Sequence, residues 1–267
     1  MTAPDLRVTL VQPDTVWLDP VANREQLAVL VRAQPATDLI VLPETFTTGF
    51  SNDAVAHAEA MDGESVAWMR ALARERDAAV AGSVPIRSGE AVYNRLLFVT
   101  PNGEIRHYDK RHQFRMAHEQ DRYAAGRDRL VVEWRGWRIC PLVCYDLRFP
   151  VFSRNRVDPA RGDDLAYDLL LYVANWPAAR HEAWRTLLRA RAMENSCYVV
   201  GVNRAGVDGH GHDHRGGSLA TDPVGVALAD CDDAPQVASV VLSLERLREY
   251  RRKFPAHLDA DAFRLTR

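Results

Sequence analysis

The 267-residue sequence has no apolar run that approaches the roughly 20 residues of a membrane-spanning helix. It also has no excess of positive charge, because 34 lysines and arginines stand against 36 aspartates and glutamates, for a formal net charge of −2. This balance gives no general attraction to nucleic acid or to an anionic membrane surface. The first residues, MTAPDLRVTL, show no basic stretch followed by a long apolar one, so we expect no signal peptide. We therefore expect neither a nucleic-acid partner nor a membrane partner.

Cysteine is scarce as well. The four cysteines, Cys140, Cys144, Cys197 and Cys231, are too few for a disulfide framework and indicate reduced thiols in the cytoplasm. If Cys140 and Cys144 lie on one extended strand, their Cα atoms are roughly 13 Å apart. A disulfide requires a separation below about 7 Å, so we expect no bridge between them.

Strand-like and helix-like segments alternate along the chain without a repeat or a linker, which predicts one α/β domain over 1–267. Strands as apolar as DLIVLP and LLLYVAN are typical of sheets covered on both faces, and interspersed hairpins predict mixed strand directions. Pro141 interrupts one predicted strand, because proline cannot donate to a central ladder. The segment 218–230 contains an Asp-Pro-x-Gly turn. The other predicted strands are 6–12, 38–43, 78–86, 92–100, 105–110, 130–134, 137–145, 168–175, 197–206 and 236–244, and the predicted helices are 21–32, 64–78, 181–195 and 245–253.

Three chemically reactive side chains each come directly after the main run of a predicted strand: Glu44 after DLIVLP, Lys110 after IRHYD and Cys144 after RICPLV, in the motifs LPETFTTGF, YDKRHQF and LVCYDLRFP. The carboxyl ends of strands are where α/β folds build their sites. A glutamate can take the proton of a thiol, and a lysine can stabilise a developing oxyanion. Each residue also has a simpler interpretation, as a solvated loop acid, a charged surface lysine or a cysteine in the core.

The three motifs, in this order and at these separations, resemble the nitrilase (carbon–nitrogen hydrolase) superfamily. The resemblance extends over essentially the whole chain. It implies a four-layer αββα sandwich, with two mixed sheets between helices, that pairs into a homodimer. Further segments that carry it are ANWP, RTLLRARAMENSCYVVGVNRAG and GGSLATDPVG.

By this resemblance Cys144 is the nucleophile, Glu44 the general base and later acid, and Lys110 the cation that stabilises the tetrahedral oxyanion. The backbone N–H of Tyr145 would be the second oxyanion donor. Glu119, in MAHEQDRY, matches a second glutamate that positions substrate and base; its alternative is a solvated loop acid. The resemblance implies no metal and no organic cofactor.

Within the superfamily, CYDLRFP, KRHQFRMAHE, ANWP and YRRKFPAHLDADAF look most like the omega-amidases. This likeness implies a small-molecule amide as substrate, namely the terminal amide of 2-oxoglutaramate or 2-oxosuccinamate. Nitrilases usually carry Trp-Glu after the nucleophile, whereas this chain has Tyr145 and Asp146. Another amide, an N-carbamoyl compound or a nitrile remains the alternative.

A substrate with a distal carboxylate requires a cation, and arginine suits a bidentate contact. Arg148 and Arg115 are the candidates, with structural ion pairs as their alternative, for instance Arg148 with Asp146 or Glu194. Trp176 is expected to wall the pocket or to lie at the edge of the core.

A different class of function comes from VDGHGHDHRGG, in which His210, His212 and His214 alternate. Histidines with this spacing could bind zinc or nickel. The tract is rich in glycine and no Cys-x₂-Cys pair accompanies it, so we expect a loop rather than a metal site. The family resemblance also implies that the predicted helix 181–195, which contains Leu187, Leu188 and Ala192, serves the dimer interface.

Overall fold

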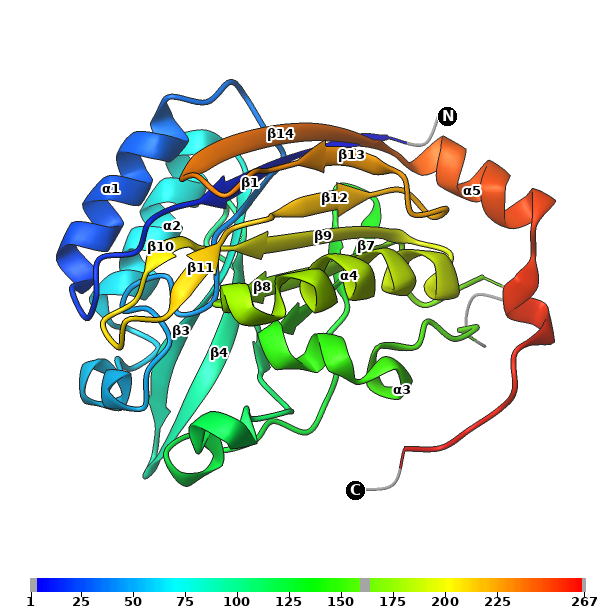
Figure 1. Ribbon diagram of the computed structural model, residues 1–267. Helices are drawn as coiled ribbons and strands as arrows, with labels where there is room; N and C mark the ends of the chain where they lie inside the picture. Colours follow the sequence, from blue (N-terminus) through cyan, green and yellow to red (C-terminus); the bar gives the residue numbers. More distant parts are fainter. Residues whose placement is uncertain (1–3, 159–163, 266–267) are drawn as a thin grey trace.

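The structure is a computed structural model that describes residues 4–158 and 164–265. Two six-stranded sheets lie face to face, with α1 (Pro20–Arg32) and α2 (Glu64–Arg76) outside one sheet and α4 (His181–Asn195) outside the other (Figure 1). Each sheet contains parallel and antiparallel neighbours. The predicted αββα sandwich with two mixed sheets is therefore confirmed.

The first sheet contributes side chains to two hydrophobic cores, one between the two sheets and one beneath α1 and α2. Along β1, Leu6, Val8 and Leu10 enter the core shared by the two sheets, whereas Val11 packs with side chains of α1 and α2. This alternation follows from the two-residue period of a strand: the face of β1 toward the other sheet is apolar at all three of these positions, whereas the other face carries Arg7 and Thr9 before Val11. In spatial order its strands are β14 (Gln236–Ser243), β1 (Asp5–Gln12), β2 (Leu39–Val41), β3 (Ala79–Ser88), β4 (Ala91–Val99) and β5 (Ile105–Asp109).

The second sheet is covered by α4. Leu188 and Ala192 of this helix are fully buried in the core and Leu187 is partly buried against it, so a dimer contact of this helix, which stays a prediction, would use its outer face. Their hydrophobic face is used for packing within the chain. In spatial order the strands are β13 (Ala227–Asp230), β12 (Leu219–Thr221), β9 (Tyr198–Asn203), β8 (Leu169–Ala174), β7 (Trp137–Val143) and β6 (Val132–Trp134).

Three smaller elements complete the described fold. A two-stranded ribbon, β10 (Ala205–Val207) with β11 (Asp213–Arg215), extends beyond β9. The short helix α3 (Pro150–Ser153) follows the motif around Cys144, and α5 (Leu244–Lys253) follows β14. In these described ranges no helix has the length and apolar character to cross a membrane.

Pro141 lies inside β7 without breaking it. β7 pairs with β8 in continuous parallel register from Ile139 to Val143. On its other side β7 pairs with β6 only as far as Ile139. From Cys140 onward β7 therefore has no ladder partner on that side among the described strands, which is a position where a sheet tolerates proline.

A buried ion cluster joins the second sheet to α5. Asp168, directly before β8, accepts hydrogen bonds from Arg138 Nε at 2.9 Å and from Arg251 Nη1 at 2.8 Å. Burial raises the pKa of Asp168, but its hydrogen bonds to Arg138 and the charge of Arg251 outweigh that effect and hold the pKa below its usual value. The carboxylate therefore compensates two guanidinium groups at once.

We expect Asp168→Asn to lower the free energy of unfolding by about 3–5 kcal/mol at neutral pH, because it removes the buried counter-charge of Arg138 and Arg251 and leaves them with the half-exposed Asp164. Asp230→Asn is the control, since Asp230 pairs with Arg185 at the surface and should cost at most about 1 kcal/mol. Urea unfolding measures both. Since Asp168 has a depressed pKa, its contribution is present above the ordinary carboxyl pKa and is lost as the pH falls below it. A similar small loss in both variants would contradict the stabilising role of the cluster.

Candidate active site

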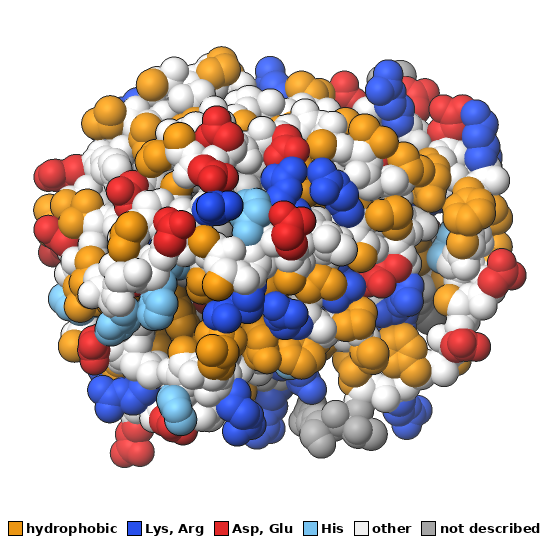
Figure 2. Space-filling view, viewed as in Figure 1, with side chains coloured by type: hydrophobic (Ala, Val, Ile, Leu, Met, Phe, Trp, Pro, Cys, Tyr) orange, Lys and Arg blue, Asp and Glu red, His pale blue; other side chains and the backbone are white. Residues whose placement is uncertain are grey.

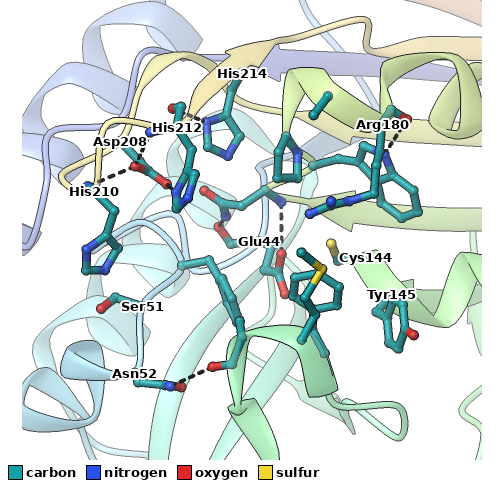
Figure 3. Close-up of a pocket in the computed structure, with 18 of the residues that line it drawn as sticks. Glu44, Ser51, Asn52, Cys144, Tyr145, Arg180, Asp208, His210, His212 and His214 are labelled. Atoms are coloured by element: carbon teal, nitrogen blue, oxygen red, sulfur yellow. Dashed lines mark hydrogen bonds and ion pairs between the residues drawn. The ribbon is translucent and has the colours of Figure 1, made fainter.

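The three predicted catalytic residues meet at one cavity. Glu44 follows β2 and Lys110 follows β5, so both come from the first sheet, while Cys144 follows β7 of the second sheet. All three line a cavity of about 450 Å³ (Figure 3). The site therefore exists only where the ends of the two sheets come together.

Lys110 is buried between two carboxylates. Its Nζ lies 2.9 Å from Glu44 Oε1 and 3.0 and 2.9 Å from the two carboxylate oxygens of Glu119. Burial lowers the pKa of Lys110, but the charges of Glu119 and Glu44 outweigh it and raise the pKa well above its ordinary value. The lysine is therefore a permanent cation next to the cavity, as an oxyanion-stabilising group must be.

Glu119 lies behind Lys110, in a 3₁₀ turn (Glu119–Asp121), and is not one of the residues that line the cavity. Its side chain is fully buried and also accepts a hydrogen bond from the backbone N–H of Phe114 at 2.6 Å. Burial raises the pKa of Glu119. The solvated-loop alternative is thus excluded by its burial, and a supporting role through Lys110 fits its position.

Two asparagines fix the orientation of Glu44. Asn94 Nδ2 donates to Glu44 Oε1 at 2.8 Å, and the backbone N–H of Asn175 donates to Glu44 Oε2 at 2.9 Å. Asn175 directly follows β8, so the second sheet holds the carboxylate that the first sheet supplies. Both carboxylate oxygens of Glu44 therefore have defined hydrogen-bond partners.

Cys144 sits at a sharp turn at the end of β7. Its φ of +44° is in the left-handed region, which side chains other than glycine rarely adopt. Asp146 stabilises this turn, because its carboxylate accepts hydrogen bonds from the N–H of Val143 at 3.0 Å, from Tyr108 Oη at 2.8 Å and from the N–H of His112 at 3.1 Å. Strain of this kind is common where a catalytic side chain must be aimed into a site.

The thiol of Cys144 is neutral at rest. Burial and the negative charge of Glu44 raise its pKa well above the ordinary value, while Lys110 lowers it to a smaller extent. The other three cysteines are buried free thiols, and burial raises the pKa of Cys140 to about 12. Cys144 is half-buried and opens into the cavity, so of the four it is the thiol that a substrate can reach.

The predicted substrate-binding residues are only partly brought together. Tyr145, Arg148 and Trp176 line the cavity, and the Arg148 guanidinium stacks on the Trp176 ring at 5.1 Å. No carboxylate of the described residues forms an ion pair with Arg148, so the proposed pairs with Asp146 and Glu194 are not found. Arg115 is exposed and does not line the cavity.

The histidine tract forms the opposite wall of the cavity (Figure 3). Asp208 accepts hydrogen bonds from the N–H groups of His210 and His212, both at 2.9 Å. His214 is buried, its Nδ1 is 3.1 Å from the carbonyl oxygen of His212, and burial lowers its pKa to about 4. The described residues contain no group of three histidine, cysteine or acidic side chains arranged to hold a metal ion, so the metal alternative gains no support from the geometry.

The family model described as carbon-nitrogen hydrolase matches residues 7–252 of this chain. The chain belongs to the carbon–nitrogen hydrolase family. It is 50% identical to the omega-amidase YafV of Escherichia coli K12, over 98% of this chain and 99% of that protein. It is 32% identical to a 2-oxoglutaramate amidase of Bacillus subtilis, over 83% of this chain and 84% of that protein.

A solved structure agrees with this assignment. XC1258 of Xanthomonas campestris, a CN-hydrolase superfamily protein with an arsenic adduct in its active site, is 53% identical to this chain. The two superpose with a TM-score of 0.96 over 98% of this chain and 100% of that one. The predicted superfamily is thus confirmed by sequence and by fold.

Several residues of this carbon–nitrogen hydrolase site were not predicted: Asn94, Asn175, Asp146 and Arg180. Asn175 and Asp146 lie inside the quoted motifs ANWP and LVCYDLRFP, which was the available signal. Asn94 lies in the middle of β4 and Arg180 directly before α4, where no local pattern distinguishes them from ordinary surface or strand residues. Their roles depend on contacts between segments far apart in the chain.

We expect Glu44→Gln to lower kcat for amide hydrolysis by about 10²- to 10⁴-fold, the usual contribution of a general base. The same variant should lower the pKa of Cys144, because one of the charges that raises this pKa is removed. The rate of Cys144 alkylation by iodoacetamide, followed across the neutral and alkaline range by peptide mass spectrometry, measures this shift. Glu90→Gln, an exposed residue outside the cavity, is the control. Full activity, or an unchanged alkylation profile, would remove Glu44 from the role of base.

Proposed function

We propose that this protein is a cysteine-dependent amidase of the omega-amidase type, which hydrolyses the terminal amide of 2-oxoglutaramate or 2-oxosuccinamate and releases ammonia. One observation carries the proposal: a reachable thiol, an oriented carboxylate and a buried ammonium share one cavity in a chain 50% identical to an omega-amidase. The similarity to a 2-oxoglutaramate amidase supports the substrate.

Acylation begins with the neutral thiol. Cys144 Sγ attacks the amide carbonyl carbon as Glu44 takes the thiol proton, and the carbonyl electron pair moves to the oxygen. The cation of Lys110 stabilises this oxyanion, with the backbone N–H of Tyr145 as the second donor. When the tetrahedral intermediate collapses, Glu44 returns the proton to the leaving nitrogen, ammonia departs and a thioester remains.

Deacylation uses the same groups in the opposite order. Glu44 takes a proton from water, which attacks the thioester carbonyl, and Lys110 again stabilises the oxyanion. Collapse breaks the carbon–sulfur bond, and the proton held by Glu44 returns to the sulfur of Cys144. Asn94 and Asn175 keep the carboxylate in place through both steps, while Glu119 holds Lys110. No step requires a metal or an organic cofactor.

The predicted homodimer and the cytoplasmic location also enter as proposals. A dimer contact is supported by exposed apolar side chains at the end of α4 and the turn after β12, where Met193 adjoins Gly225. A cytoplasmic location is supported by four free thiols. We further propose that residues 1–267 act as one domain, because one core cluster contains side chains from both sheets.

Ammonia release by the purified protein tests the reaction. We expect rapid release from 2-oxoglutaramate, feeble release from L-glutamine and none from a simple nitrile or an N-carbamoyl amino acid. Cys144→Ala should lose at least about 10³-fold in rate, because the covalent step is removed. Cys231→Ala is the matched control, since Cys231 is buried outside the cavity. Activity that survives Cys144→Ala would contradict the mechanism, and a preference for the nitrile or the N-carbamoyl compound would contradict the substrate.

A further inference from the structure

Arg180 places a guanidinium group in the cavity without a counter-charge from the described part of the chain. It ends a 3₁₀ turn (Ala178–Arg180) directly before α4, and its carbonyl oxygen accepts a hydrogen bond from Trp176 Nε1 at 2.8 Å. Its guanidinium lies over the Phe114 ring at 5.2 Å. Among the described residues no carboxylate forms an ion pair with it. Backbone and ring contacts thus fix the position of this cation.

Arg148 is arranged in the same way on the Trp176 ring and lines the same cavity. Stacking on an aromatic ring uses the flat face of a guanidinium group and leaves the N–H groups at its edge available. Lys and Arg side chains gather at the surface over the start of α4, beside the histidines over the β10–β11 ribbon (Figure 2). Two cations with available donors therefore lie on one wall of the cavity.

The opposite wall has the opposite character. Figure 3 shows Asp208 and His210 across the cavity from Arg180, with Cys144 on the side of Arg180. The carboxylate of Asp208 lies 3.2 Å from His212 Nδ1 and also accepts two backbone N–H groups. A substrate carboxylate is repelled by Asp208 and attracted by the arginines, so the cavity orients an anionic substrate.

We propose that Arg180, together with Arg148, selects a 2-oxo acid amide over the corresponding amino acid amide, an inference that rests on the function proposed above. In a 2-oxo acid the carboxylate and the adjacent oxo oxygen are acceptors that lie in one plane, which matches the planar fork of a guanidinium group. In glutamine the same carbon carries an ammonium group. The ammonium group is positively charged and has only hydrogen-bond donors. It is therefore repelled by the two guanidinium groups and cannot accept a hydrogen bond from them.

The test compares four amides that differ at the distal end: 2-oxoglutaramate, the monoamide of glutaric acid, L-glutamine and pentanamide. Arg180→Ala should reduce kcat/KM for 2-oxoglutaramate by roughly 10- to 150-fold, the usual effect of a lost charged hydrogen bond, chiefly through a higher KM. Its kcat/KM for pentanamide should stay within about twofold. The preference for 2-oxoglutaramate over glutamine should fall at least about tenfold.

Arg180→Lys separates charge from geometry. Lysine keeps the cation but lacks the fork, so we expect it to restore hydrolysis of the glutaric monoamide more fully than the preference for the 2-oxo compound. Arg115→Ala tests the rival arginine, and Arg74→Ala, an exposed residue of α2 outside the cavity, is the neutral control.

An equal loss for all four amides in Arg180→Ala, an unchanged preference for 2-oxoglutaramate over glutamine, or a selective loss in Arg115→Ala would each overturn the inference while leaving the amidase function intact. If the wild type releases no ammonia from 2-oxoglutaramate, the proposed function fails. The role of Arg180 is then tested by measuring the binding of 2-oxoglutaramate. Calorimetry then compares Cys144→Ala with Cys144→Ala/Arg180→Ala. Weaker binding of 2-oxoglutaramate in the double variant supports the role of Arg180, and equal binding or none overturns it.

Discussion

The buried ammonium of Lys110 between the carboxylates of Glu44 and Glu119 is the interaction on which the rest of the site depends. Each of these charges would cost several kcal/mol to bury alone. At an effective dielectric constant near 20, the attraction between two opposite charges about 4 Å apart is about 4 kcal/mol. The cost of burying these charges is therefore offset only when all three groups are present. They come from the ends of β2 and β5 and from the 3₁₀ turn at Glu119. Correct folding of these three segments therefore brings together the proposed base and the cation proposed to stabilise the oxyanion.

The second sheet of the sandwich adds Cys144, the proposed nucleophile, to these three residues. β7 delivers Cys144 from the second sheet, and the backbone N–H of Asn175, at the end of β8, crosses to Glu44 Oε2. The carboxylate of Glu44 is thus held by both sheets, and a shift of one sheet relative to the other would change its position relative to the thiol of Cys144. The strained turn at Cys144 also depends on both sheets. Asp146, which stabilises this turn, accepts a hydrogen bond from Tyr108 of β5 in the first sheet. Core packing between the sheets is in this sense part of the catalytic geometry.

Local sequence pattern was sufficient for much of this architecture. Apolar runs and helical spacing predicted the strands and the main helices, and the positions of Glu44, Lys110 and Cys144 after strands predicted where the chemistry lies. The pattern could not predict Asn94 or Asn175, since their function is a hydrogen bond to a residue 50 or 131 positions away. It gave Arg115 as a candidate for holding the substrate carboxylate and did not single out Arg180, which lines the cavity. Nothing in KRHQFR reveals that the turn at Arg115 faces outward, whereas Arg180 is turned inward by its contacts with Trp176 and Phe114. Leu188 and Ala192 illustrate the same limit, because the sequence of an apolar helix face does not show whether a sheet of the same chain or another subunit packs against it.

A neutral thiol beside a carboxylate also explains how such a site can be both reactive and stable. The charge of Glu44 raises the pKa of Cys144, so the resting sulfur is a poor nucleophile toward oxidants and alkylating agents. The same carboxylate removes the proton once a carbonyl carbon lies within reach and Lys110 can receive the negative charge on its oxygen. Activation is therefore coupled to correct placement of the amide. A polarised cavity strengthens this coupling, because a substrate held at its distal carboxylate by arginine presents its amide to Cys144 in one orientation rather than several.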